Sequence, residues 1–186
     1  MKRLFDVVLA LLISMLLLLP IMLMAILVRV TSKGPAIYWT SRVGRRNIIF
    51  QMPKFRTMQL DTPEVATHLL SNPSHYLTPV GSFLRKYSLD ELPQLWSILV
   101  GDMSFVGPRP ALFNQEDLIL KRNQYGVDKL VPGLTGWAQV NGRDELSTLI
   151  KVQYEVEYLH KHTFWFDMKI IGLTFLKVVH RDGVSH

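Results

Sequence analysis

An uncharged stretch near the N-terminus constrains this chain more than any other feature. Residues Val7 to Val28 form 22 consecutive positions without a charged side chain, and nearly all of them are Leu, Ile, Met, Val or Ala. As a helix, this stretch is roughly 33 Å long at about 1.5 Å per residue. The hydrocarbon core of a bilayer is roughly 30 Å thick. Length and composition therefore favour a membrane helix.

Two other interpretations fit the stretch less well. Lys2 and Arg3 resemble the basic start of a signal peptide, but the apolar run is too long for one and no small-x-small cleavage site follows Val28. A buried helix of a soluble protein is the second alternative, and a core helix of this length without a charged face is rare. The membrane helix remains the best account.

The topology of the stretch depends on its flanks and on Pro20. Cationic residues lie on both sides, so the charge pattern gives no inside–outside bias. Pro20 lacks an N–H and its ring collides with the carbonyl of Leu16, which predicts a kink. A re-entrant pair of half-helices, with both ends on one cationic face, accounts for both facts. A proline-kinked spanning helix is the alternative.

Net charge and cysteine content limit the classes of binding partner and of chemical site that the chain can have. The formal net charge is +6 and the pI is about 9.7, which suits nucleic acid, anionic lipid or an anionic substrate. Beside a membrane segment, lipid headgroups and phosphorylated substrates are the expected partners. The chain has no cysteine, so it has no disulfide, cysteine metal site or thiol nucleophile. This absence fits a cytoplasmic location.

The remaining pattern predicts a mainly α-helical domain with a short β-hairpin. Residues 36–40 and 48–52 are aromatic or β-prone and flank a basic turn. Helices are expected at 80–86 and at 89–100, the latter ended by Gly101. The segments 107–110 and 132–136 are rich in glycine and proline and predict turns and loops.

Two further helices are expected at 145–160 and 164–181. In the second, an apolar stripe contains Trp165, Met168, Ile171, Phe175 and Val178, opposite Asp167, Thr174, Lys177 and Arg181. This helix either packs on the core or lies in the membrane interface. The six histidines have no metal-binding spacing, because His160 and His162 face different sides of a helix.

Asp90 and Glu91 are the strongest candidates for chemistry. Adjacent carboxylates at a helix start often only stabilise the macrodipole, by about 0.3–1 kcal/mol. A carboxylate pair also binds Mg²⁺, which prefers oxygen ligands and bridges to substrate phosphates. An aspartate can instead attack phosphorus and form an acyl phosphate.

Four ordered blocks make the chain recognisable. They are KFRTM (54–58), SLDELPQL (88–95), GDMSFVGPRP (101–110) and VPGLTGWAQVNGR (131–143). Together they closely resemble the bacterial sugar transferase family, the monotopic phosphoglycosyl transferases. The resemblance runs from the membrane segment nearly to the C-terminus. The family's membrane helix usually breaks at a Ser-Pro pair, whereas Leu19 precedes Pro20 here.

The resemblance implies a covalent reaction in two steps. Asp90 would be the nucleophile that takes a sugar 1-phosphate from a nucleotide sugar, which is expected to be a UDP-sugar. Polyprenyl phosphate, such as undecaprenyl phosphate, would then accept it in the first membrane step of glycoconjugate assembly. Glu91 is expected to bind Mg²⁺, and Asp90 is its expected co-ligand.

The same blocks assign substrate-binding residues. Lys54, Arg85, Arg109 and Arg143 match basic positions of the family's motifs, and Pro108 and Pro110 frame Arg109. Arginine suits phosphate because its planar fork binds two oxygens at once. Taken singly, each of these cations would more often be a solvated surface charge.

These inferences give a division of the chain and two competing functions. Residues 1–30 are expected to form the membrane segment, and residues 31–186 a catalytic domain with amphipathic interfacial helices on the cytoplasmic face of the bacterial inner membrane. A non-catalytic membrane scaffold with a basic lipid-binding surface is the alternative. Nucleic-acid binding is disfavoured, because the cations follow phosphate-loop motifs rather than a face interleaved with aromatics.

Overall fold

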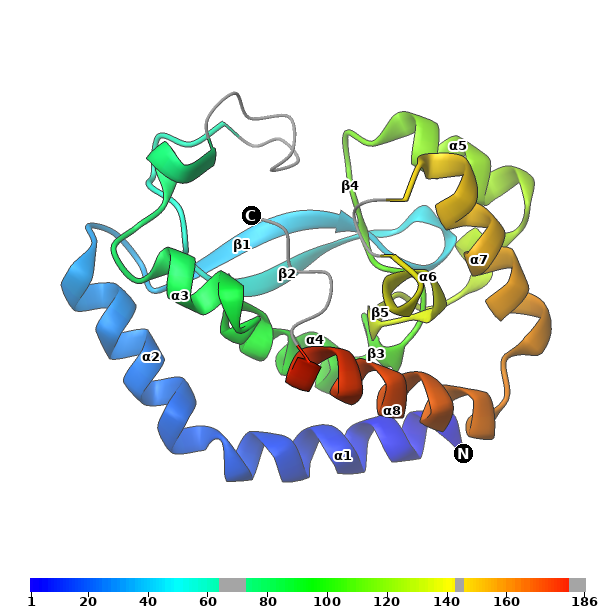
Figure 1. The fold of residues 1–186 in the computed structure, drawn as a ribbon, viewed down its shortest axis with the longest axis horizontal. Helices are drawn as coiled ribbons and strands as arrows, with labels where there is room; N and C mark the ends of the chain where they lie inside the picture. The colour runs from blue at the N-terminus through cyan, green and yellow to red at the C-terminus, as the bar shows by residue number, and fades with distance from the viewer. Residues whose placement is uncertain (64–72, 143–145, 181–186) are drawn as a thin grey trace.

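The computed structural model describes residues 1–63, 73–142 and 146–180, and is mostly helical with two small sheets (Figure 1). Its elements are α1 (Lys2–Leu16), α2 (Leu18–Thr31), β1 (Ile37–Val43), η1 (Arg45–Asn47), β2 (Ile49–Phe55), η3 (Pro73–Tyr76), α3 (Gly81–Lys86), η4 (Leu89–Gln94), α4 (Leu95–Val100), β3 (Ser104–Val106), β4 (Ala111–Leu112), α5 (Glu116–Gln124), η5 (Val127–Lys129), β5 (Gly133–Thr135), α6 (Trp137–Val140), α7 (Thr148–Lys161) and α8 (Phe164–His180). The expectation of a mainly helical domain is confirmed.

The uncharged N-terminal stretch forms a bent pair of helices. Helices α1 and α2 meet at Leu17 at an angle of 65°. Pro20 lies in the first turn of α2, where it cannot donate to the carbonyl of Leu16 and would clash with it in a continuous helix. The predicted kink is therefore confirmed. Among the described helices, none is long and apolar enough to cross a bilayer alone. The two helices of the bent pair together meet that requirement by length and composition only.

The bent pair, with α1 along the bottom of Figure 1 and α2 rising at the left, carries a large exposed apolar surface. The exposed side chains are Leu4, Val8, Leu11, Leu12, Met15, Leu16, Leu18, Leu19, Met22, Leu23, Ile26, Leu27 and Val30. Ala10 and Val28 are the apolar residues of the pair that are fully buried, each in a different core cluster. Apolar surface of this extent on a soluble monomer is unusual and marks an interaction with a membrane or another protein.

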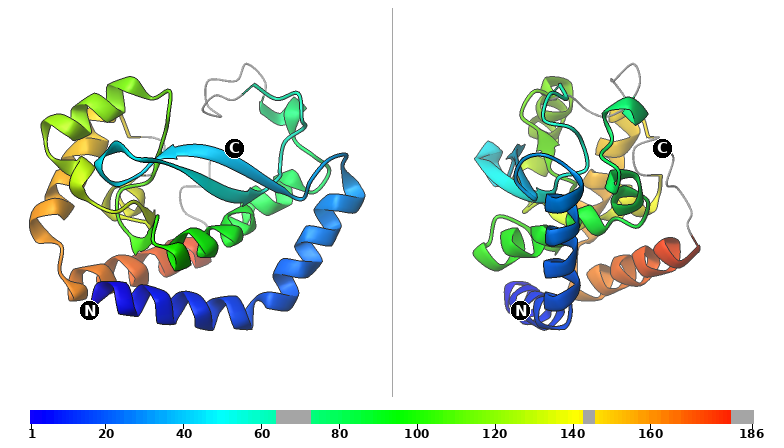
Figure 2. Two further views of the ribbon diagram at one scale, coloured as in Figure 1. Left: turned by 180° about the vertical axis from the view of Figure 1, so that it is seen from behind. Right: turned by 90° about the vertical axis from the view of Figure 1, so that its left-hand side faces the viewer.

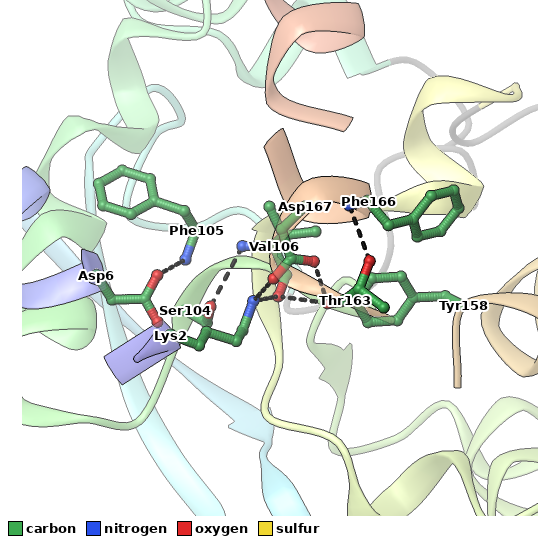
Figure 3. A network of polar contacts seen from close by, with 9 residues as sticks. All are labelled: Lys2, Asp6, Ser104, Phe105, Val106, Tyr158, Thr163, Phe166 and Asp167. Atoms are coloured by element: carbon green, nitrogen blue, oxygen red, sulfur yellow. Dashed lines mark hydrogen bonds and ion pairs between the residues drawn. The ribbon is translucent and has the colours of Figure 1, made fainter. Parts of the chain in front are cut away.

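Charged side chains fasten the start of α1 to the rest of the molecule (Figure 3). Lys2 Nζ donates to the carbonyl of Val106 over 3.0 Å and pairs with Asp167 Oδ2 over 2.5 Å. Tyr158 donates its hydroxyl to the other oxygen of Asp167 over 2.7 Å. Lys2, Asp167 and Tyr158, here called the anchor cluster, thus join α1, α7 and α8.

A second set of contacts holds the same helix end to α4 and β3. Arg3 donates to the carbonyls of Ile98 and Leu99, at 2.5 and 2.7 Å, close to the C-terminal end of α4. A cation is favourable there because helix C-termini carry partial negative charge. Asp6 is buried and accepts a hydrogen bond of 3.2 Å from the backbone N–H of Phe105.

The hairpin bridges the end of α2 and the lobe formed by α5 and α7, as the reverse view shows (Figure 2). Strands β1 and β2 pair antiparallel from Ile37 opposite Phe55 to Val43 opposite Ile49. The short strand β4 extends this sheet by pairing with the end of β1. The predicted hairpin is confirmed, and each strand runs three residues further than expected at its C-terminal end.

Strand β5 corrects one expectation. The segment 132–136 was expected to be a loop, but Gly133–Thr135 pairs parallel with β3, Ser104 opposite Gly133 and Val106 opposite Thr135. Two residue pairs across a glycine-rich segment leave no periodicity from which a strand could be predicted.

Helix α8 packs on the core through only part of its apolar stripe, which includes Ile171. Asp167 and Ile170 are buried, whereas Trp165 and Phe175 are 79% and 68% exposed. Asp167 faces inward because Lys2 neutralises its charge. Core packing is therefore confirmed for the face of α8 that contains Ile170 and Ile171, whereas Trp165 and Phe175 stay exposed.

Candidate active site

Asp90 and Glu91 lie on a tight turn rather than on a regular helix. Ser88 adopts a left-handed conformation with φ of 54°, and the N–H of Glu91 bonds to the carbonyl of Ser88 over 3.2 Å. That three-residue spacing is typical of a 3-10 helix. Pro93 has no N–H to give to an α-helical bond, and regular geometry begins at Leu95. The predicted helix 89–100 is therefore two elements, η4 and α4.

Two cations converge on one oxygen of Glu91. Lys54 Nζ and Arg109 Nη2 each lie 2.8 Å from Glu91 Oε1. Lys54 stands near the end of β2, which packs against η4, and Arg109 belongs to the turn after β3. Burial would raise the pKa of Glu91, but the charges and hydrogen bonds of Arg109 and Lys54 outweigh it and hold that pKa well below its usual range.

Asp90 is left in a different state from its neighbour. It is 8% exposed, and Lys54 Nζ lies 3.7 Å from its Oδ2. Burial raises the pKa of Asp90, and Glu91 adds to this, while Lys54, Arg85 and Arg109 offset part of the rise. Asp90 therefore presents a carboxylate that is shielded from water and less strongly neutralised than Glu91.

The structure brings together most of the residues expected from the sequence. Asp90, Glu91, Lys54 and Arg109 form one cluster, here called the catalytic cluster after the role that the sequence leads us to expect, and Arg85 is close enough for its charge to act on Asp90. Arg109 is 40% exposed, so its guanidinium can be reached from solvent. Arg143 lies outside the described residues.

Pro108 and Pro110 hold Arg109 in a turn whose backbone is fixed on both sides. The carbonyl of Pro108 accepts from the N–H of Gly133 over 2.9 Å. A Cβ on Gly107 would lie 2.2 Å from the carbonyl oxygen of Val131, and one on Gly133 would lie 2.0 Å from the nitrogen of Gly107. The two glycine-rich motifs pack this closely because neither position has a side chain.

Sequence reasoning missed two arginines behind this turn. Arg122 Nη2, on α5, donates to the carbonyl of Arg109 over 2.9 Å. Arg42 Nη1, on β1, donates to the carbonyl of Pro110 over 3.2 Å. Neither residue stands inside the four blocks, and spacing along the chain gives no sign that they meet the turn.

The carboxylate pair fits a magnesium ion by its donor set. Within the described ranges there is no cluster of three or more His, Cys, Asp or Glu side chains that could hold a metal. Magnesium does not need one, since one or two carboxylates together with substrate phosphates and water satisfy it. Lys54 and Arg109 both bind Oε1 of Glu91, so Oε2 and the oxygens of Asp90 are the candidate metal ligands.

Comparison with known proteins adds independent findings. The model of a family described as "Bacterial sugar transferase" matches residues 1–181. A relative from Escherichia coli (strain K12), named UDP-glucose:undecaprenyl-phosphate glucose-1-phosphate transferase, is 40% identical over 185 residues, which cover 95% of this chain and 40% of the relative. The undecaprenyl-phosphate galactose phosphotransferase of Salmonella typhimurium is 37% identical over 98% of this chain and 41% of its own length.

A third relative has a length closer to that of this chain. The sugar transferase EpsL of Bacillus subtilis, named as uncharacterized, is 37% identical over 100% of this chain and 90% of its own length. The chain thus spans about two fifths of the first two relatives but nearly all of the third.

Proposed function

Because the chain belongs to the bacterial sugar transferase family, we propose that it transfers a sugar 1-phosphate from a UDP-sugar to undecaprenyl phosphate. The names of two relatives supply the donor and acceptor classes. The observation that carries the proposal is the catalytic cluster, where one buried aspartate stands beside a glutamate that already holds two cations.

The first step is a displacement at phosphorus. A carboxylate oxygen of Asp90 attacks the β-phosphorus of the UDP-sugar, the bond from that phosphorus to the bridging oxygen breaks, and UMP leaves. The product is an acyl phosphate that carries the sugar on Asp90. In the second step a phosphate oxygen of undecaprenyl phosphate attacks the same phosphorus. The Asp90 carboxylate leaves, and the sugar is now joined to undecaprenol through a diphosphate.

The surrounding residues divide the remaining tasks. Glu91 holds Lys54 and Arg109 at the site, and these cations bind the oxygens of the donor phosphates. Arg85 and Arg143 are proposed to bind the substrate as well. Glu91 and Asp90 would hold Mg²⁺, which supplies neutralisation of phosphate charge when bound.

The bent helix pair is proposed to be re-entrant, with both ends on the cytoplasmic face. The support is that charged contacts hold both ends of the pair to the same domain. Lys2 and Arg3 bind β3, α8 and α4 at one end. At the other end the buried guanidinium of Arg56 binds the backbone carbonyls of residues 32–34, just past α2. The exposed apolar surface between these ends would lie in the lipid.

The transfer activity is tested with purified protein, Mg²⁺, undecaprenyl phosphate and a panel of UDP-sugars. We expect release of UMP together with a lipid-linked diphosphate sugar from at least one donor. No turnover of any donor would overturn the proposal in favour of the scaffold. UMP release at steady state that does not depend on undecaprenyl phosphate would overturn it in favour of hydrolysis of the donor.

The topology is tested with single cysteines, because the native chain has none. One is placed directly after Met1 and one at the exposed Lys33. A membrane-impermeant thiol reagent should label neither in intact cells and both in lysed cells. Labelling of one site alone in intact cells would show a spanning segment.

A further inference from the structure

The turn that carries Arg109 has each of its three carbonyls held by a different part of the fold. The backbone of Gly133 binds the carbonyl of Pro108, Arg122 binds that of Arg109, and Arg42 binds that of Pro110. Two of the three turn residues are prolines, which offer no N–H. Acceptor groups are therefore the main means by which the fold can grip this turn.

Arg122 is itself fixed by a buried ion pair. Its Nε lies 2.8 Å from Glu155 Oε2 on α7, and its Nη2 bonds to Glu155 Oε1 in a paired, fork-like contact. Arg122 is 8% exposed and Glu155 is 2% exposed. Nη2 carries two hydrogens, of which one serves Glu155 and the other the carbonyl of Arg109.

A buried ion pair is a costly way to join two helices. The attraction between two buried charges often fails to offset the free energy lost when both are removed from water. Well-packed apolar residues of similar volume often stabilise a protein as much or more. The same helix α5 carries an exposed pair, Lys121 with Asp117 at 3.0 Å, which shows the ordinary alternative. What distinguishes Arg122 is its third contact, on the backbone of the residue that binds Glu91.

We propose that Arg122, aligned by Glu155, is a positioning residue that sets the backbone of Arg109 so that its guanidinium meets both Glu91 and the donor phosphates. This inference rests on the proposed function and adds residues from α5 and α7 to its site. Lysine cannot replace arginine here, because a single ammonium cannot bind both oxygens of Glu155 in a plane and still reach the carbonyl of Arg109.

The test is Arg122→Lys, which keeps the positive charge opposite Glu155 but loses the hydrogen bond to the carbonyl of Arg109. We expect kcat/KM for the UDP-sugar to fall about ten- to a hundredfold, the scale of a displacement near 1 Å at a reacting group. The KM for undecaprenyl phosphate should stay unchanged. Asp117→Asn, which breaks the exposed pair on the same helix, is the matched control and should leave both constants unchanged.

The outcomes separate this inference from the proposed function. If the unmodified protein transfers no sugar phosphate, the proposed function fails. If it is active, and Arg122→Lys matches Asp117→Asn or loses activity only in proportion to its folded fraction, the positioning role is overturned. Should Arg122→Lys not fold, Arg42→Lys decides. A fall in kcat/KM for the donor that is smaller than tenfold, with no change in the acceptor KM, supports a positioning role for the hydrogen bonds to the turn. Unchanged constants overturn that role.

Discussion

Two groups of buried charges in this molecule are built in opposite ways. In the anchor cluster, each oxygen of the Asp167 carboxylate has its own donor, Lys2 on one and Tyr158 on the other. In the catalytic cluster, Lys54 and Arg109 both bind a single oxygen of Glu91 at 2.8 Å, while Lys54 lies 3.7 Å from Asp90.

The difference distinguishes a cluster that is satisfied by the fold itself from the cluster that is proposed to carry the chemistry. Burial, together with the bond and charge of Asp167, raises the pKa of Tyr158 far above its usual value, so its hydroxyl remains a neutral donor at any physiological pH. The anchor cluster is thus complete without a ligand. The pKa values of Asp90 and Glu91 are instead shifted in opposite directions: the pKa of Asp90 is raised and that of Glu91 is lowered. Such a split is typical of functional sites.

The largest effect is expected for Asp90→Asn. The amide has nearly the same size but supplies no anionic oxygen to attack phosphorus, so transfer should fall by about 10⁴-fold or more, as when other enzymes lose a nucleophile. Circular dichroism and membrane association should match the unmodified protein. Activity within tenfold of normal would remove the distinction between the clusters.

A smaller loss is expected for Glu91→Gln. The neutral side chain no longer binds Lys54 and Arg109 by charge and is a weaker magnesium ligand, so the rate should fall about a hundredfold, the scale seen when one group that stabilises transition-state charge is removed. A titration of activity with Mg²⁺ should also shift to higher concentrations. An unchanged magnesium dependence would argue that Glu91 serves only the two cations.

Breaking the anchor cluster should affect stability and not chemistry. Lys2→Met leaves the Asp167 carboxylate with Tyr158 alone, which should cost about 1.5–3 kcal/mol, the usual value of a hydrogen bond to a charged group. Thermal unfolding in detergent measures this. Lys121→Met, which removes the exposed pair on α5, is the control and should cost less than about 0.5 kcal/mol. A fall in kcat/KM per folded molecule as large as that of Glu91→Gln would contradict the comparison.

The smallest effect concerns pH and stability. A carboxyl group whose pKa is raised on folding contributes stability below its ordinary pKa of about 3.9 and loses it as the pH rises through the raised value. Ionised Asp90 therefore weakens the fold at neutral pH, and Asp90→Asn should raise Tm there. The difference should vanish near pH 3.5 in metal-free buffer. A lower Tm for the variant at neutral pH would mean that the charge stabilises the fold.

The sequence predicted the catalytic cluster better than the anchor cluster, for a physical reason. Asp90, Lys54 and Arg109 stand in motifs whose residue types suit phosphate chemistry, so resemblance identified them before any geometry was known. The sequence pattern marks Lys2 only as a charge that flanks the apolar stretch, and Asp167 only as part of the polar face of an amphipathic helix. Their pairing spans 165 positions of the chain, and no local pattern encodes such a contact.

The same limit applies to the fold. Pro20 acts on the carbonyl of Leu16, four residues away, and the kink was predictable. Strand β5 and the 3-10 turn of η4 depend on long-range pairing and on the left-handed Ser88, so neither followed from propensity. The division at residue 30, the role of Arg143 and the binding of Mg²⁺ stay predictions.

The central claim, that Asp90 carries the sugar phosphate covalently, is tested most directly by mass spectrometry. The protein is incubated with Mg²⁺ and its UDP-sugar in the absence of undecaprenyl phosphate, quenched and digested. The account predicts a phosphosugar adduct on the peptide that contains Asp90, which disappears when undecaprenyl phosphate is added. An active protein that shows no adduct under any quench, or an adduct on another residue, would contradict the account and assign Asp90 a role in binding instead.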